Sequence, residues 1–388
     1  MPGLRVLVVA RRFWPFTDDC SQRLLHFCAA LTRAGASVTV VTARWHSNWP
    51  PYSFCREVPI HRLLPAPNTN WNESHFQKNV VQWVSNKATD FDCIYVDRPD
   101  GLLSALQSKS TKWHLPLLVR FSPDDAAFGL SPGQKLSQVA MADLCRRCFR
   151  VVSPTSNAHR TLVSQGISES QIVRIGDIAW DPVTRTEELR TVASNALFDM
   201  SSDFLIPGRT DLLIHLGLAE AIPLRKAIQA VCDLLDAGVL LRMWVIGAGL
   251  DPSALYDLTK SRGWHREILI FDGFDDLQEL IRVADCCIAS NPKEAIQFTL
   301  PMMATAGVPM IIADHQDCRG WLPAANHFQL YSSEYLLAQK LQDFVANRER
   351  WTTMANSLRQ GLRRTQSIQD CVQQWLSLFR DSILERKA

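Results

Sequence analysis

The sequence has 388 residues, of which 47% are hydrophobic and 21% are charged, and its formal net charge is +2. Single hydrophobic cores stop growing at about 250–300 residues, so this length and composition predict a globular protein of two domains. The nearly neutral charge gives no basic field for nucleic acid, and no apolar run approaches the roughly 20 residues of a membrane span.

Strand and helix patterns alternate from the start of the chain. The apolar run LRVLVVA at 4–10 predicts a first strand and is too short for the apolar region of a secretory signal. With 11 scattered cysteines, this favours reduced thiols and a cytoplasmic location. The helix pattern SQRLLHFCAALTRAG and the strand pattern SVTVVTA follow. Further buried runs are DCIYV, PLLVRF, RVVSP, DLLIHLG, RMWVIG, EILIF, DCCIAS and VPMIIA. Continuous apolar strands between helices indicate an α/β fold with parallel sheets covered on both faces.

The turn after the first strand, ARRFWPFTDDCSQR, lacks the glycines of a phosphate-binding turn. Ligands of open parallel sheets lie beyond the carboxyl ends of the strands, which places the two arginines of this turn well for binding. Solvated surface arginines are the alternative interpretation. The residues that we expect on this side of the site are Arg11, Arg12, Asp19, Cys20, Arg120 and Ser122.

Four tryptophans fall in loops of the first half of the chain, where aromatic rings either stack on sugars or cover the core. They are Trp14, Trp45, Trp49 and Trp71. The spacing of His315 and Cys318 has no second half that would complete a zinc site, and we expect no metal.

The alternation of strands and helices pauses between about Asp177 and Arg209 and then restarts. The last helix pattern carries an apolar stripe at intervals of three and four residues, which has no partner after the complete second alternation. We therefore expect this helix to pack on the first domain. The predicted boundaries are 1–180 together with 366–388 for the N-terminal domain, 181–199 for the connection and 200–365 for the C-terminal domain.

Two glycines, Gly247 and Gly249, follow the strand pattern RMWVIG. The third glycine of a dinucleotide fingerprint would fall at Pro252, and the first strand is not followed by this fingerprint either. A dehydrogenase is therefore disfavoured. The two glycines either admit a ligand or form the turn.

The order of elements resembles the retaining, nucleotide-sugar-dependent glycosyltransferases of the GT-B fold, the group-1 or family-4 class. The second half supplies LLIHLG, RMWVIGAG, EILIFDGFDDLQELIRVADCCIASNPKE and ATAGVPMII. The first half supplies FWP, RAGASVTVVTA and SPTSNAHRTLVSQGISESQIVRIGD. The resemblance implies two doubly wound, Rossmann-like domains that face a cleft, with the acceptor on the N-terminal side and a nucleotide sugar on the C-terminal side.

The resemblance also implies a donor site, and the sequence departs from it. An arginine and a lysine normally neutralise the leaving diphosphate, but Leu218 and Pro223 stand at those positions. Arg225 and Lys226 are the nearby replacements. The first of two family glutamates matches Glu294, whereas Met302 stands where the second would grip the ribose hydroxyls.

The donor-side residues implied by the resemblance are Gly247, Gly249, Asp272, Gly273, Phe274, Arg225, Lys226, Ala295, Ile296 and Met302, with Glu294 as the catalytic residue. The glycine that lets backbone amides approach the phosphate corresponds to about Gln297. We expect the base on backbone groups of 272–274 and Glu294 against the sugar.

Two functions of different classes remain open. The first is a metal-independent, cofactor-free glycosyltransferase that moves a sugar from a nucleotide sugar to a carbohydrate or lipid-linked acceptor with retention. The second is a catalytically inactive homologue that binds a sugar, a nucleotide or a partner protein. Glu294 favours the first; Met302 and the missing cations favour the second.

Overall fold

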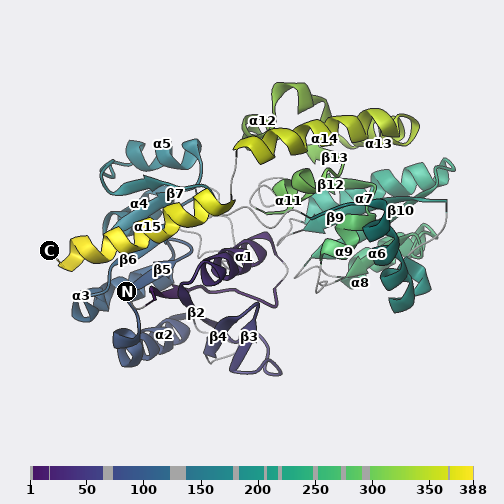
Figure 1. Ribbon diagram of the computed structural model, residues 1–388. Helices are drawn as coiled ribbons and strands as arrows, with labels where there is room; N and C mark the ends of the chain where they lie inside the picture. The colour runs from purple at the N-terminus through teal and green to yellow at the C-terminus, as the bar shows by residue number, and fades with distance from the viewer. Residues whose placement is uncertain are drawn as a thin grey trace. The chain divides into compact units, whose positions relative to one another are not determined.

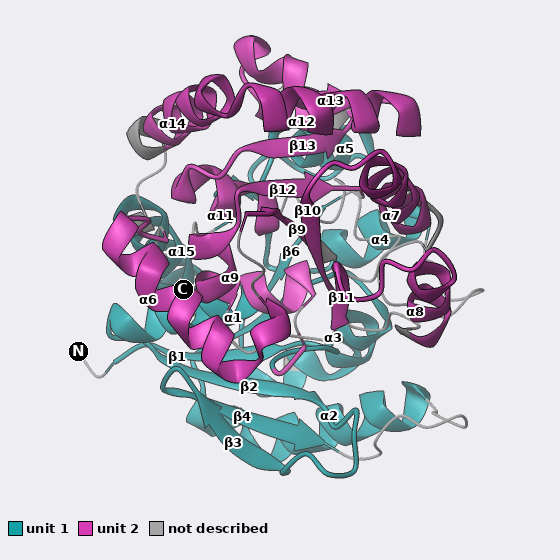
Figure 2. Cartoon of the chain, turned by 90° about the vertical axis from the view of Figure 1, so that its right-hand side faces the viewer, with its two compact units in different colours: residues 1–14, 24–178, 368–388 teal, residues 15–23, 179–367 magenta. Residues whose placement is uncertain are grey.

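The protein is described by a computed structural model over residues 3–16, 18–63, 73–122, 137–177, 183–204, 208–216, 221–247, 252–271, 277–290, 298–365 and 368–387. The chain forms two compact units (Figure 2). Unit 1 comprises 1–14, 24–178 and 368–388, and unit 2 comprises 15–23 and 179–367. The segment 15–23, expected in the N-terminal domain, groups with unit 2 by its contacts, and so does all of the expected connection, 181–199.

Unit 1 is built on an eight-stranded sheet with the order β3-β4-β2-β1-β5-β6-β7-β8 (Figure 1). All neighbouring strands are parallel except β3 and β4. The strands are β1 (Arg5–Val9), β2 (Ser37–Ala43), β3 (Tyr52–Cys55), β4 (Val58–Leu63), β5 (Cys93–Val96), β6 (Leu117–Arg120), β7 (Arg150–Ser153) and β8 (Ile172–Arg174). The helices are α1 (Asp19–Arg33), whose first turn groups with unit 2, α2 (Glu73–Lys87), α3 (Gly101–Trp113), α4 (Gln138–Arg146), α5 (Ser156–Ser164) and α15 (Ile368–Lys387).

Alternate residues of β1 enter two separate cores, because successive side chains of a strand point to opposite faces of the sheet. Val6 and Val8 pack with residues of α1 and α15. Leu7 and Val9 pack with residues of α2 and α3. Both faces of the sheet are thus covered, which explains why this strand is apolar from Val6 to Val9.

Unit 2 has a six-stranded, all-parallel sheet with the order β11-β10-β9-β12-β13-β14. Its strands are β9 (Thr210–Leu216), β10 (Leu241–Gly247), β11 (Ile268–Phe271), β12 (Cys286–Ala289), β13 (Met310–Ala313) and β14 (Leu330–Tyr331). Its helices are α6 (Glu187–Met200), α7 (Ala221–Asp236), α8 (Pro252–Ser261), α9 (Leu277–Val283), α11 (Thr299–Ala306), α12 (Gln316–Trp321), α13 (Glu334–Ala346) and α14 (Arg348–Thr365).

The central strands of unit 2 divide their side chains in the same way. Trp244 and Ile246 of β10 enter one core, whereas Met243 and Val245 enter the other. The expected α/β architecture of two doubly wound, parallel-sheet domains is therefore confirmed. Among the described residues, no helix combines the length and the apolar character needed to cross a membrane.

The last helix, α15, packs in unit 1 (Figure 1). Trp375 and Phe379 lie in the core that contains Val6 and Val8. The ring of Trp375 meets Phe27 edge-on at a centroid distance of 4.9 Å and Tyr95 at 5.3 Å. The end of the chain thereby completes the core at its beginning.

We expect Trp375→Ala to lower the free energy of unfolding of unit 1 by about 3–5 kcal/mol, because it leaves a large cavity in a closed core. Trp375 is 1% exposed, whereas Leu384 on the same helix is 65% exposed. Leu384→Ala is the matched control and should change stability by less than about 0.5 kcal/mol. Urea unfolding followed by tryptophan fluorescence measures both, and equal effects of the two variants would contradict this packing.

Candidate functional site

The amino end of α11 receives a carboxylate from a distant part of the chain, within unit 2. The backbone N–H of Phe298 donates to Oδ2 of Asp19 at 2.6 Å, and that of Thr299 donates to Oδ1 at 2.9 Å. The hydroxyl of Thr299 donates to Oδ1 as well. The N-cap residue of α11, Phe298, provides no side-chain cap. Asp19 thus satisfies amides that a helix N-terminus leaves unpaired.

Asp19 is also the first residue of α1, whose end is organised by Asp18. The Asp18 carboxylate accepts from the backbone N–H of Ser21 at 3.0 Å and from its hydroxyl at 2.7 Å. The Asp19 carboxylate therefore belongs to the amino ends of two helices. The partial positive charge at each end favours a negative group.

Burial opposes that charge. Asp19 is 1% exposed, and this burial raises its pKa to about 7, although the hydrogen bonds from Thr299 and Phe298 favour the ionised form. The neighbouring Asp18 raises the pKa further. The carboxyl group therefore changes its charge near neutral pH.

Asp19 is expected on the acceptor side. Its carboxylate contacts α11, the helix that the family resemblance assigns to the donor side, and a contact with an acceptor stays a prediction. The resemblance puts the phosphate-binding amides at about Gln297, directly before Phe298. Gln297 itself lies outside the described residues.

Few of the expected donor-side residues fall within the described part of the chain. Gly247 ends β10 and is buried. Arg225 and Lys226 are exposed on α7, and Lys226 pairs with Glu334 at 3.2 Å. Met302 is 3% exposed and packs in a core of unit 2 rather than at a surface. The expected residues outside the described ranges are Gly249, Asp272, Gly273, Phe274, Glu294, Ala295 and Ile296.

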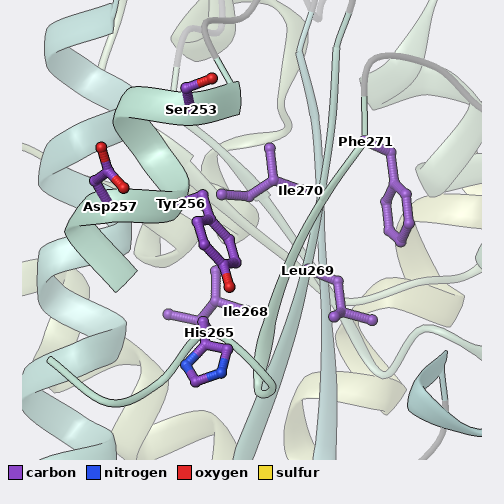
Figure 3. A pocket seen from close by; sticks show the side chains of 8 residues that line it. All are labelled: Ser253, Tyr256, Asp257, His265, Ile268, Leu269, Ile270 and Phe271. Carbon is purple, nitrogen blue, oxygen red and sulfur yellow. The ribbon is translucent and has the colours of Figure 1, made fainter. Parts of the chain in front are cut away.

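A pocket of about 570 Å³ runs along β11, the edge strand of the sheet of unit 2 (Figure 3). Ile268 and Ile270 lie on the α8 side of the strand, and Leu269 and Phe271 lie on the other side. Phe271 directly precedes the segment 272–274 that is expected to hold the base. The four residues of β11 give the pocket an apolar wall.

The arginines expected on the acceptor side gather around one tryptophan in unit 1. The guanidinium carbon of Arg12 lies 4.7 Å from the ring centroid of Trp45, and that of Arg11 lies 5.5 Å from it. Arg11 also faces Glu73 at 3.9 Å. Burial lowers the pKa of Arg11, against the attraction of Glu73 and Asp100. The half-buried ring of Trp45 is thus in contact with two cations.

Arg120 and the partly exposed Asp177 form a bidentate ion pair in unit 1. Nε and Nη2 of Arg120 donate to the carboxylate at 2.7 and 2.8 Å, and Arg120 is 1% exposed. Ser122 and Cys20 are also buried. Whether these residues contact an acceptor stays a prediction.

Two carboxylates beside Arg11 were not predicted from the sequence. Asp100 caps α3 by accepting from the amides of Leu102 and Leu103, and burial raises its pKa to about 6. Glu73 begins α2. The signal for Asp100 was present, since an aspartate, a preferred capping residue, stands directly before the apolar helix pattern GLLSALQ. In the described part of the chain, no group of three or more potential ligands forms a metal site.

Comparisons with known proteins agree with this architecture. Residues 20–177 match the family model of the glycosyl transferase 4-like domain. Sucrose-phosphate synthase from Thermosynechococcus elongatus superposes with a TM-score of 0.73 at 13% identity, over 97% of this chain and 98% of that chain. The chain has the GT-B glycosyltransferase fold.

Two further GT-B structures were solved with ligands. HepE from Anabaena, in complex with UDP and glucose, has a TM-score of 0.73 at 13% identity and covers 97% of this chain and 99% of its own. The catalytic domain of starch synthase IV from Arabidopsis thaliana, bound to ADP and acarbose, has a TM-score of 0.67 at 11% identity, with coverage of 98% and 99%. Comparison of the sequence with proteins of curated function finds no match.

We expect the amide protons of Phe298 and Thr299 to titrate with a midpoint near pH 7, the pKa to which burial raises Asp19. As the pH falls through this value, the carboxyl gains a proton and accepts weaker hydrogen bonds, so both amide signals move upfield. NMR of selectively labelled protein measures the midpoint. A midpoint near the ordinary value of about 4 would contradict the burial argument.

Asp19→Asn should abolish this titration, whereas Asp199→Asn, at an exposed position of α6, should leave it unchanged. The sign of the stability effect follows from the same pKa. Because the folded-state pKa lies above the ordinary 3.8, the contribution of Asp19 to stability is complete below about pH 4 and is lost as the pH rises through about 7.

Proposed function

We propose that this protein is a glycosyltransferase that moves a sugar from a nucleotide sugar to an acceptor with retention. The observation that carries the proposal is the similarity of nearly the whole chain to a GT-B protein that holds UDP and glucose. The match of residues 20–177 to the glycosyl transferase 4-like domain supports it independently. The acceptor is a carbohydrate or a lipid-linked saccharide.

In this proposal the donor lies beyond the carboxyl ends of the strands of unit 2, where doubly wound sheets bind nucleotides. Backbone groups near Gly247 and in 272–274 hold the nucleotide, and Glu294 faces the sugar. The departing phosphate of the donor accepts the proton of the acceptor, so the reaction uses no metal and no protein base.

Asp19 would set the affinity of this site for phosphate. Its carboxylate already accepts from the amides of Phe298 and Thr299. A donor phosphate that uses the same end of α11 must displace this carboxylate or enter beside a like charge, and like charges at close range disfavour binding. Weak binding of the parent protein follows, with protonation of Asp19 as the condition that relieves it.

We expect Asp19→Asn to bind nucleoside diphosphates about tenfold more tightly than the parent protein, which corresponds to about 1.4 kcal/mol. The asparagine keeps one acceptor oxygen but removes the competing charge. Isothermal titration with UDP, ADP and GDP and with their sugar conjugates measures the change, and Asp199→Asn is the matched control. Unchanged or weaker binding by Asp19→Asn would exclude competition at α11.

A second candidate is a non-catalytic GT-B homologue that binds a partner or a sugar. Three observations favour it: an internal carboxylate caps α11, Met302 is packed in the core, and Lys226 is paired with Glu334. If neither the parent protein nor Asp19→Asn binds any of these nucleotides at millimolar concentration, this candidate becomes the better explanation.

The cations of α7 provide a separate test of catalysis. Leu218 and Pro223 stand where the family resemblance expects an arginine and a lysine. If Arg225 and Lys226 replace those cations, changing both to alanine should abolish nucleotide binding and transfer. Lys226 pairs with Glu334, so Glu334→Gln is the control for loss of that ion pair alone. The measurement is nucleotide titration together with release of the sugar from radiolabelled donor. Unchanged nucleotide binding by the double variant would mean that Arg225 and Lys226 do not neutralise the diphosphate.

A further inference from the structure

A second pocket of about 440 Å³ lies in unit 2 near the amino ends of its strands. Asp285 on its wall directly precedes β12, and Pro309 directly precedes β13. Nucleotides of doubly wound sheets bind at the carboxyl ends. This pocket is therefore separate from the proposed donor site, and nothing in the proposed reaction uses it.

The wall of the pocket comes from several elements that pack on one another. The first turns of α6, the end of α9, the turn between α11 and β13, and α14 all contribute. Helix α6 packs on α9 and helix α14 packs on α11, and Figure 2 shows α14, α11 and α6 following one another along the left side of unit 2. The residues of α14 on the wall are spaced by four, four and three positions, which places them on one face: Arg348, Thr352, Asn356 and Arg359.

The pocket carries an excess of positive charge. Five arginines but only two carboxylates, Asp285 and Glu187, lie on its wall. Asp285 already serves two of the arginines: Nη2 of Arg190 lies 2.7 Å from Oδ1, and Nη1 of Arg348 lies 3.7 Å from Oδ2. One shared carboxylate leaves donor capacity on both guanidinium groups.

Two other arginines of the wall, Arg185 and Arg282, are held by neighbouring acceptors. Arg185 donates from Nη2 to the carbonyl of Ala284 at 2.7 Å and from Nε to that of Arg282 at 3.2 Å. These carbonyls are neutral acceptors, so they hold the guanidinium in place without cancelling its charge. Burial, followed by the repulsion of Arg190, lowers the pKa of Arg185 to about 10, which leaves it charged at neutral pH. Arg282 itself donates to Glu279 at 2.6 Å.

Arg359 is a cation of this wall for which the described residues provide no counterion. It has no hydrogen-bond or ion-pair partner among the described residues, and its Nε is buried. Its side chain lies against Gly307, where an added Cβ would stand 3.4 Å from Cδ and Nη1 of Arg359 and 3.0 Å from Oδ1 of Asn356. Gly307 has φ of +73°, so the turn that opens this space favours glycine.

We propose that this pocket binds a small soluble molecule through a phosphate group. Guanidinium groups match phosphate oxygens with paired hydrogen bonds, and Arg359 with the unused donors of Arg190 and Arg348 supplies them. The arginines surround a recess from several elements instead of forming a flat basic face, which fits a compact anion. A volume of 440 Å³ accommodates a phosphorylated sugar or a nucleotide.

Inorganic pyrophosphate is the probe for this site. Isothermal titration of the full chain should show saturable binding with a dissociation constant below about 1 mM. Arg359→Gln should weaken it at least about tenfold, because one charge-assisted contact is lost. Arg350→Gln makes the same charge change on the same helix outside the pocket and should leave the affinity unchanged.

Three results would overturn the proposal: no binding by the parent protein, equal affinity of Arg359→Gln and the parent protein, or equal losses in Arg359→Gln and Arg350→Gln. Equal affinity would mean that the anion binds elsewhere, including at the proposed donor site. Thermal unfolding without ligand checks that each variant is folded. If Arg359→Gln does not fold, Asn356→Asp replaces it: a carboxylate added to the wall should weaken binding as well, and unchanged affinity would again contradict the site.

Discussion

The backbone amides at the amino end of α11 need hydrogen-bond acceptors, and the packing of unit 2 depends on how this need is met. The first amides of α11 point inward and its own N-cap residue, Phe298, offers no acceptor, so an acceptor must come from elsewhere. Asp19 provides it while beginning a second helix. This contact explains why the short segment 15–23 groups with unit 2 while the rest of α1 groups with unit 1. One carboxylate therefore connects the start of the chain to the helix after β12.

The sequence predicted most of the parallel strands because both of their faces are buried, which makes most of their positions apolar. It did not predict β8 and β14, which are very short, nor β3 and β4, in which every second side chain is more exposed, so that neither is a continuous buried run. The tight turn between β3 and β4 uses Arg56 and Glu57 with positive φ of 47° and 68°. Such turns normally contain Asn or Gly, so no turn signal was available in the sequence. A turn that lacks the usual turn residues cannot be recognised in the sequence, and it becomes evident only when the pairing of the two strands is known.

In the candidate site, too, some contacts could be predicted from the sequence and others could not. Strand-end placement was sufficient to bring Arg11 and Arg12 together, since both follow β1, but the ring of Trp45 that they cover comes from another strand end. The partner of Asp19 was beyond prediction because Phe298 lies 279 residues away. A pair of adjacent aspartates before a helix ordinarily indicates a cap and an acidic first turn. Asp18 accepts the hydrogen bonds from Ser21 at this end of α1, while Asp19, in the acidic first turn, accepts those from the distant helix.

The two ends of the sheet in unit 2 balance charge in opposite ways. At the carboxyl end, an internal carboxylate occupies α11, and Leu218 and Pro223 stand where the family resemblance expects cations. At the amino end, five arginines exceed the carboxylates that face them. A fold that binds anions at the carboxyl ends of its strands here carries its surplus of guanidinium groups at the other end. A phosphate that loses its water requires compensating positive charge. The charge pattern therefore disfavours anion binding at the carboxyl end of this sheet and favours it at the amino end.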